Sequence, residues 1–153
     1  MRPYRHYRLR IGIGILAISL LLGWQVAAQS SLTQAQIEQS NYVQACGSCH
    51  LALPAEVMPS QTWQRLLLDN NHYGQQIPLP TGVPLQLAWN YLKQNSKSLL
   101  TRESVPFRLA DSRYFKALHL QVDFPRPVRV TSCVDCHLGT DQGNFATLKP
   151  EWQ

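Results

Sequence analysis

Apolar residues recur at helical spacing in several stretches of the chain. Residues 33–36, Thr-Gln-Ala-Gln, have the pattern of a capping box, which predicts that a helix starts there and leads into a cysteine motif. Further on, Trp63, Leu66 and Leu67 form the apolar face of a helix predicted over residues 63–69. A third helix is predicted where apolar residues repeat three and four positions apart, at Leu85, Ala88, Tyr91 and Leu92.

The segments between these predicted helices are irregular. Prolines at positions 78, 80 and 84 interrupt the chain before the third helix, and the periodicity is weak over residues 97–111. A short helical stretch follows at residues 113–120. The pattern therefore predicts a mostly α fold with long irregular connections, divided into an N-terminal module, 29–96, and a C-terminal module, 97–153.

Residues 1–28 have the features of an export signal. Four arginines precede the apolar run Ile11–Gly23, and the small residues 26–28 indicate cleavage before Gln29. An uncleaved anchor is the alternative, because Ile11–Ala28 just reaches the length that crosses a bilayer as a helix. Both interpretations place the rest of the chain outside the cytoplasm, in the periplasm, or in the thylakoid lumen if the source is photosynthetic.

The distribution of charge argues against a nucleic-acid-binding protein. The formal net charge is +5, but four of the fourteen basic residues lie within the first ten positions, in the predicted export signal. The remainder of the chain is close to neutral and has no concentrated basic stripe, which a nucleic-acid surface requires. We therefore expect no nucleic-acid partner.

All four cysteines fall in two copies of one short pattern, Cys-x-x-Cys-His. The copies are Cys46-Gly47-Ser48-Cys49-His50 and Cys133-Val134-Asp135-Cys136-His137. On a helical turn, positions i, i+3 and i+4 share a face, so two thiols and one imidazole can meet the edge and the centre of one flat macrocycle. This is the attachment pattern of c-type haem, in which the sulfurs form thioethers and the histidine binds the iron. We expect two haem c groups.

Other uses of paired cysteines fit this spacing less well. In zinc ribbons about 15 to 20 residues separate the two pairs, whereas 83 residues lie between Cys49 and Cys133. A thioredoxin-like pair needs a strand before the first cysteine, and no β-rich run precedes Cys46. Disulfides between neighbouring i and i+3 positions would constrain almost nothing. Haem attachment is therefore the favoured interpretation.

The second axial ligand of each iron decides whether that iron is closed or open to substrates. His6 lies in the export signal, and His50 and His137 follow their cysteines, which leaves His72 and His119 for the two remaining positions. We pair His72 with the first haem and His119 with the second. A crossed pairing, or a surface role for either histidine, remains open at this stage.

Methionine is the other common haem ligand, and Met58 is the only one after the export signal. It follows His50 by only eight residues, within a segment bounded by Pro54 and Pro59. That distance is short for a chain to pass around a haem and reach its far face.

With these motifs identified, the chain resembles the small bacterial dihaem cytochromes c in which both haems have two histidine ligands. The likeness covers roughly residues 42–145 and includes Tyr42-Val43, Pro54, Trp63, His72-Tyr73-Gly74, Tyr114-Phe115, His119 and Gly143-Asn144-Phe145 around the two cysteine motifs. Tyr73 stands where the family usually has phenylalanine, and the proline-rich residues 77–85 are atypical of it. The resemblance implies distal ligands at His72 and His119, and a soluble electron carrier that reduces or oxidises another haem protein.

The expected function is electron transfer rather than catalysis. Irons with two histidine ligands would be low-spin. Their reduction potentials would also be lower than those of irons with a methionine ligand, because methionine ligation raises the potential. Two alternatives remain: a dihaem peroxidase or reductase with one open iron, and a haem subunit of a membrane-anchored complex if the export signal is not cleaved. We expect no enzyme activity, a redox protein as partner, and membrane association only if the N-terminal segment persists.

Overall fold

The computed structural model describes residues 32–124 and 127–153. The predicted export signal at residues 1–28 lies outside the described residues. The chain divides into two compact units, Met1–Thr33 and Gln34–Gln153, and the fold below is that of the second. Within the described residues, no helix has both the length and the apolar character needed to cross a membrane.

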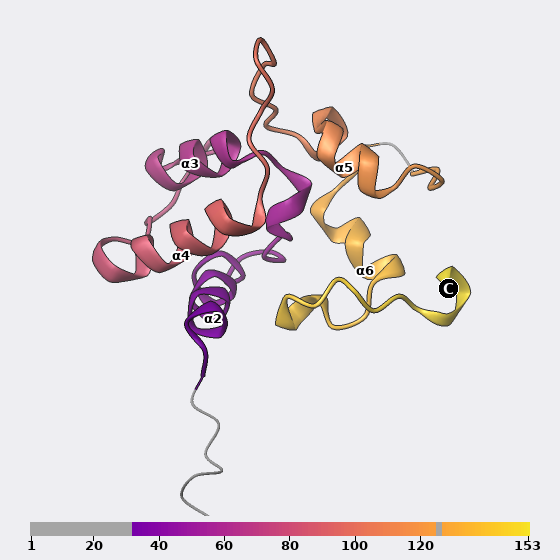
Figure 1. Cartoon of the computed structure of the whole chain (residues 1–153), viewed down its shortest axis with the longest axis horizontal. Helices are drawn as coiled ribbons and strands as arrows, with labels where there is room; N and C mark the ends of the chain where they lie inside the picture. The colour runs from indigo at the N-terminus through magenta and orange to yellow at the C-terminus, as the bar shows by residue number, and fades with distance from the viewer. Residues whose placement is uncertain (1–31, 125–126) are drawn as a thin grey trace, which may run out of the picture. The chain divides into compact units, whose positions relative to one another are not determined.

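Two long helices form the base of the unit. Helix α2, Gln34–Cys46, packs along helix α4, Gly82–Asn95 (Figure 1). The buried carboxylate of Glu38 lies between them and accepts hydrogen bonds from the side-chain amides of Gln34, Asn90 and Gln94. Helix α4 is the helix predicted around Leu85, but it starts before Pro84. Proline is tolerated there because backbone N–H groups in the first turn of a helix have no helical partner.

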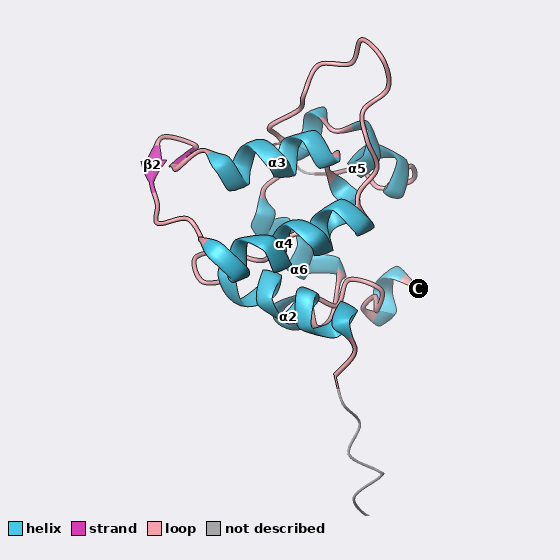
Figure 2. Cartoon of the chain, turned by 60° about the vertical axis from the view of Figure 1, so that its left-hand side comes forward, coloured by secondary structure: helices cyan, strands magenta, loops and turns pink. Residues whose placement is uncertain are grey.

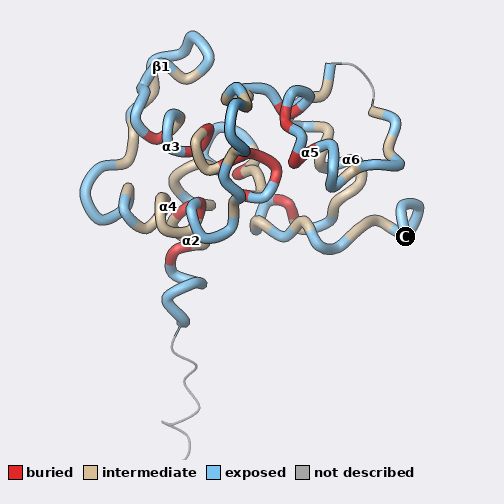
Figure 3. The backbone as a smooth tube through the Cα atoms, turned by 45° about the horizontal axis from the view of Figure 1, so that its top comes forward, coloured by how far each residue is buried: buried red, intermediate tan, exposed pale blue. Residues whose placement is uncertain are grey.

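The apolar core lies between these helices and the segment after the first cysteine motif. Helix α3, Ser60–Leu68, and the 3₁₀ helix η1, Ala55–Val57, pack against α4. Buried positions gather along these segments of the backbone (Figure 3). The fully enclosed members of this core include Tyr42, Ala55, Met58, Trp63, Leu67, Ala88, Leu92 and Phe115. Trp63 is fixed by its indole N–H, which donates to the carbonyl of Ala55. Met58 is a core side chain, 2% exposed.

A short β-hairpin follows α3, where the sequence pattern indicated only a loop. Strands β1, Asn71–His72, and β2, Gln75–Gln76, pair antiparallel across the two-residue turn Tyr73-Gly74 (Figure 2). Both turn residues have positive φ, 55° for Tyr73 and 90° for Gly74, as a type I′ turn requires. The Asn71 side chain stabilises the turn by accepting a hydrogen bond from the Gly74 N–H.

The segment after α4 has little regular structure until helix α5. The 3₁₀ helix η2, Leu109–Asp111, leads into α5, Arg113–Leu118, and His119 caps the end of α5. Ser112 anchors this helix to the core: its hydroxyl accepts from the Phe115 N–H and donates to the Val57 carbonyl. The predicted helix at residues 113–120 is thus confirmed up to residue 118.

The last part of the chain consists of short turns. It contains η3, Val130–Ser132, α6, Cys133–Cys136, η4, Thr140–Gln142, and η5, Pro150–Trp152. Among residues 127–153, the only buried residue is Thr140, so this segment has no apolar core of its own. The prediction of a mostly helical fold with long irregular connections is confirmed.

Candidate functional site

The first cysteine motif lies at the end of α2. Cys46 is the last residue of the helix, and residues 47–49 continue as a turn that carries Cys49 and His50 to the surface. The Gly47 N–H donates to the Val43 carbonyl, which keeps the turn tight against the helix. The first motif is therefore a helix end followed by a turn rather than one continuous helical turn.

Glycine is required at position 47 for a reason that the sequence does not reveal. A Cβ atom on Gly47 would lie 2.5 Å from the carbonyl oxygen of Val43, a backbone atom that cannot move without shifting the helix end. The small residue therefore allows the chain to turn directly after Cys46.

His50 and His72 lie together at the first site. Their ring centroids are 5.9 Å apart and their planes differ by 12°. The Nδ1 atom of His50 lies 2.7 Å from the Leu51 carbonyl, and His72 is the last residue of β1, next to the turn residue Tyr73. The structure therefore brings together the two histidines that the sequence analysis assigned to the first haem.

The second cysteine motif forms α6, a single helical turn. The His137 N–H donates to the Cys133 carbonyl, and Gly139 ends the turn with a φ of 73°. The C-terminal residues run alongside the motif, with Leu148 bridged to His137 and the Lys149 N–H donating to the Cys136 carbonyl. The C-terminal segment thus lies beside the helical turn that carries Cys133 and Cys136.

His119 and His137 lie together at the second site. Their ring centroids are 6.2 Å apart and their planes are nearly perpendicular, at 88°. The Nδ1 atom of His119 lies 2.8 Å from the Phe115 carbonyl. The ring of Phe124 lies edge-on to His119, and the ring of Phe145 lies near His137.

A cavity of about 760 Å³ adjoins the second pair. This volume is within the usual range for small-molecule and cofactor sites, about 300 to 1,000 Å³. Cys133, Cys136, His119 and His137 line it, together with the aromatic side chains Phe115, Phe124, Phe145, Tyr91 and Trp152. Residues of the N-terminal half also contribute to its wall, from α2, η1 and α4: Gln39, Pro54, Glu56, Val57, Tyr91 and Asn95.

The donor set fits two haem c groups. A bond from a metal to an imidazole nitrogen is about 2.0 Å, so two imidazoles on opposite sides of one metal ion have centroids roughly 6 Å apart. Both observed separations, 5.9 and 6.2 Å, agree with this value. The four cysteines are free thiols, and no three His, Cys, Asp or Glu side chains in the described ranges cluster as a metal site, which disfavours a four-cysteine zinc centre.

One histidine at each site has a lowered pKa, which favours the neutral form that binds a metal. Burial lowers the pKa of His72, and the neighbouring His50 lowers it further. Burial also lowers the pKa of His137, although the Phe145 backbone opposes this effect. The Nδ1 atoms of His72 and His137 are buried and have no hydrogen-bond partner within the described part of the chain.

Three of the four cysteines, Cys46, Cys133 and Cys136, are partly exposed to solvent. Burial raises the pKa of Cys46 to about 11, and it also raises the pKa of Cys133 and Cys136. Cys49 is exposed. A raised thiol pKa disfavours disulfide exchange before haem is attached, since the thiolate is the reactive form.

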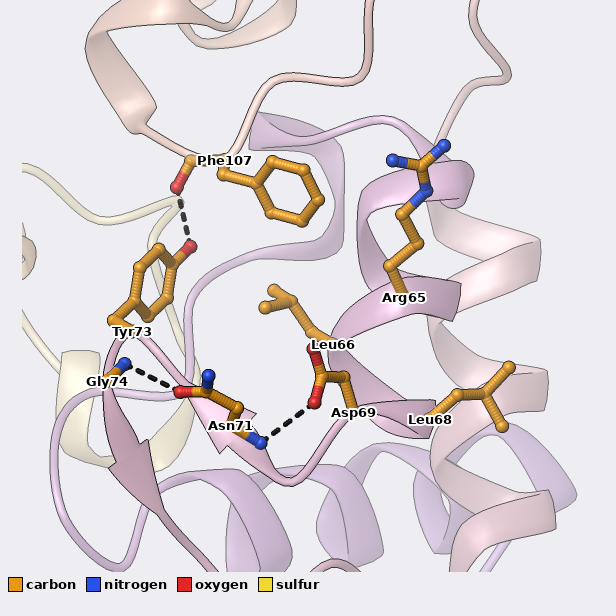
Figure 4. A pocket seen from close by; sticks show the side chains of 8 residues that line it. All are labelled: Arg65, Leu66, Leu68, Asp69, Asn71, Tyr73, Gly74 and Phe107. Carbon is orange, nitrogen blue, oxygen red and sulfur yellow. Dashed lines mark hydrogen bonds between the residues drawn. The ribbon is translucent and has the colours of Figure 1, made fainter.

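A second hollow, of about 550 Å³, lies near the first site between α3, the β-hairpin and Phe107 (Figure 4). Asn71 and Tyr73 line it, whereas His72 does not. The Tyr73 hydroxyl donates to the Phe107 carbonyl, and the Arg108 guanidinium lies over the Tyr73 ring. On the other side, the edge of Tyr73 contacts His72, with centroids 5.1 Å apart.

The sequence analysis did not identify the residues that surround the histidine pairs. Tyr73 was noted only as a difference from the related family, although it contacts His72 directly. Phe115 and Phe124 surround His119, and their positions four residues before and five residues after it were the available signal. The carbonyls that hold the rings leave no signal in the sequence, because every residue has one.

The chain is similar to known dihaem cytochromes c. The family model "Dihaem cytochrome c" matches residues 42–145. A dihaem cytochrome c from Rhodobacter sphaeroides has a similar solved structure, with a TM-score of 0.51 and 27% identity over 68% of this chain and 94% of that chain. A dihaem cytochrome c from Shewanella baltica OS155 has a TM-score of 0.49 and 23% identity over 70% of this chain and 86% of that chain.

No curated protein matches the chain. The family model nevertheless covers more than half of the sequence and both cysteine motifs. The chain therefore belongs to the dihaem cytochrome c family and carries two haem c groups.

Proposed function

We propose that this dihaem cytochrome is an electron carrier in which each iron is closed by two imidazoles. In this assignment Cys46 and Cys49 hold the first haem, and Cys133 and Cys136 hold the second. His50 and His72 ligate the first iron, and His119 and His137 ligate the second. Bound haem supplies a metal ion that exchanges one electron at a time.

The observation that carries this proposal is the pairing of the histidines. Each pair has a centroid separation close to that of two imidazoles on one metal ion, 5.9 Å at the first site and 6.2 Å at the second. In each pair one ring also has its Nδ1 atom against a backbone carbonyl, Leu51 for His50 and Phe115 for His119. Such a contact fixes the tautomer and directs Nε2 toward the metal.

A closed iron leaves no position for a substrate, which supports electron transfer over peroxidase or reductase chemistry. The proposed partner is another redox protein, such as a haem protein. The periplasm is the proposed location, since c-type attachment motifs follow a predicted export signal.

Carbon monoxide binding tests the ligand assignment. The reduced protein with both haems should not bind carbon monoxide, because both axial positions are filled. His72→Ala and His119→Ala should each bind one equivalent, at the first and the second haem respectively. Met58→Leu is the control, since Met58 is buried in the core and should have no effect. Binding by the unmodified protein, or no binding by either alanine variant, would contradict the proposal.

A further inference from the structure

The two histidine pairs differ mainly in the angle between their rings. The planes of His50 and His72 are nearly parallel, at 12°, whereas those of His119 and His137 are nearly perpendicular, at 88°. The centroid separations are similar, 5.9 and 6.2 Å. The two pairs thus have similar centroid separations but different angles between their rings.

Contacts on His50 and His72 hold the first pair in its parallel arrangement. The rings of Tyr73 and His72 meet at an interplanar angle of 82°. Tyr73 is itself held on two sides. Its hydroxyl donates a hydrogen bond to the Phe107 carbonyl (Figure 4), and the Arg108 guanidinium lies 4.8 Å from its ring centroid. The His50 ring is restrained by the Leu51 carbonyl at Nδ1. The Tyr73 ring is therefore the contact that limits rotation of the His72 ring, whose Nδ1 atom has no hydrogen-bond partner among the described residues.

Different contacts hold His119 in the perpendicular arrangement. The Phe115 carbonyl lies 2.8 Å from its Nδ1 atom, and the Phe115 ring lies 4.5 Å from its centroid. Phe124 meets the His119 ring at an interplanar angle of 73°. These contacts restrain His119 independently of Tyr73, which belongs to the first site.

The angle between axial imidazoles determines the electronic structure of a ferric low-spin haem. Each imidazole donates π density perpendicular to its own plane. Two parallel imidazoles therefore raise the energy of the same iron d orbital and separate it from its partner. Two perpendicular imidazoles act equally on both orbitals and leave them nearly degenerate. The iron d orbital that accepts an incoming electron therefore differs in energy between the two arrangements.

We propose that the protein holds two electronically distinct haems, with Tyr73 positioning His72 parallel to His50 and with Phe124 positioning His119 perpendicular to His137. This inference rests on the proposed bis-histidine ligation. In this inference Tyr73 and Phe124 do more than pack against the histidines: by orienting them, they make the electronic structures of the two haems different.

Electron paramagnetic resonance of the oxidised full-length protein with both haems attached tests the proposal. The first haem should give a rhombic spectrum with resolved g values, and the second a strongly anisotropic signal with one much larger g value. Each signal should integrate to one spin per chain. Two signals of the same type would overturn the inference, whereas a high-spin signal would instead refute the proposed ligation.

Variants then separate positioning from packing. Tyr73→Leu should shift the g values of the rhombic signal only, and Tyr73→Phe should restore them because the ring edge is retained. Phe124→Leu should shift the large-g signal only. Phe107→Leu is the matched control: it replaces an aromatic side chain in the same hollow but keeps the carbonyl that Tyr73 contacts, so neither signal should change. The proposal fails if Tyr73→Leu and Phe124→Leu leave both signals as they were.

Discussion

At the scale of single residues, the identity of an axial ligand sets the potential of its iron. Methionine in place of histidine raises the potential. We expect His72→Met to raise the potential of the first haem by on the order of 0.1 V, within the roughly 0.8 V range that axial ligands span. The second haem should be unaffected. Spectroelectrochemical titration measures both potentials.

The matched variant is His119→Met, which should raise the potential of the second haem instead. If both variants moved the same haem, the assignment of His72 and His119 to separate irons would be wrong. If neither variant moved a potential, these histidines would not be ligands.

A second prediction at this scale concerns Gly47. Gly47→Ala places a Cβ atom against the Val43 carbonyl, so the last turn of α2 must shift and carry Cys46 with it. We expect the free energy of unfolding to fall by about 1 to 3 kcal/mol, the usual cost of overpacking, and haem attachment at the first motif to become less complete. Denaturant titration and the mass of the intact protein measure the two effects. Ser48→Ala, at the neighbouring exposed position, should change neither.

The attachment cysteines and the four candidate ligands could be predicted from sequence because spacing and counting restrict the choice. Four cysteines occupy two identical motifs, and only His72 and His119 remained after the histidines of the motifs and the export signal were assigned. The orientation of the rings could not be predicted. It depends on backbone carbonyls and on Tyr73 and Phe124, which meet the histidines only in the folded chain.

At the scale of elements, α2 and α4 are joined by a buried acidic side chain. Glu38 is 4% exposed and accepts hydrogen bonds from three amide groups through both carboxylate oxygens. Glu38→Gln would place an amide N–H₂ group opposite at least one of these donors. We expect the free energy of unfolding to fall by about 1 to 3 kcal/mol, because a buried donor is left without an acceptor.

Denaturant titration of the protein with both haems attached measures this change. Glu151→Gln is the control, since Glu151 is exposed near the C-terminus and should alter stability little. An unchanged midpoint for Glu38→Gln would show that the amide network does not stabilise the contact between α2 and α4.

The helices were predictable where an apolar face recurs over several turns, as for α3 and α4. The hairpin was not, because each strand has only two residues, Asn71–His72 and Gln75–Gln76, too few to show alternation. The turn also contains Tyr73 at positive φ, a conformation that bulky residues rarely adopt. The Asn71 side chain and the contacts of Tyr73 compensate for this in the folded chain.

At the scale of the whole molecule, the cavity at the second site has walls from both halves of the chain. Gln39 and Tyr91 come from α2 and α4, and Glu56 follows the first cysteine motif by only a few residues. The division into modules 29–96 and 97–153 stays a prediction. The shared wall could not be predicted, because these residues have no chemical signature of cofactor binding and gather only through packing.

The core and the C-terminal segment should depend on haem to different extents. The buried apolar side chains lie between Tyr42 and Phe115, whereas no apolar residue is buried in the described chain from residue 127 onward. A cofactor that fills the cavity would supply the apolar surface that this segment lacks. Its thioether and axial bonds together would link parts of the chain that are distant in sequence. The second haem should therefore act as the core of the C-terminal segment.

Removing that haem tests this dependence. In Cys133→Ala/Cys136→Ala, amide hydrogen exchange should become fast throughout residues 127–153, because local opening no longer exposes a buried surface. The protection of α4 should remain, since its contacts with α2 and α3 do not involve the second motif. Cys46→Ala/Cys49→Ala is the matched variant and should leave residues 127–153 protected. Equal protection of that segment with and without the second haem would mean that protein contacts alone, such as the bridge between His137 and Leu148, are sufficient to hold it.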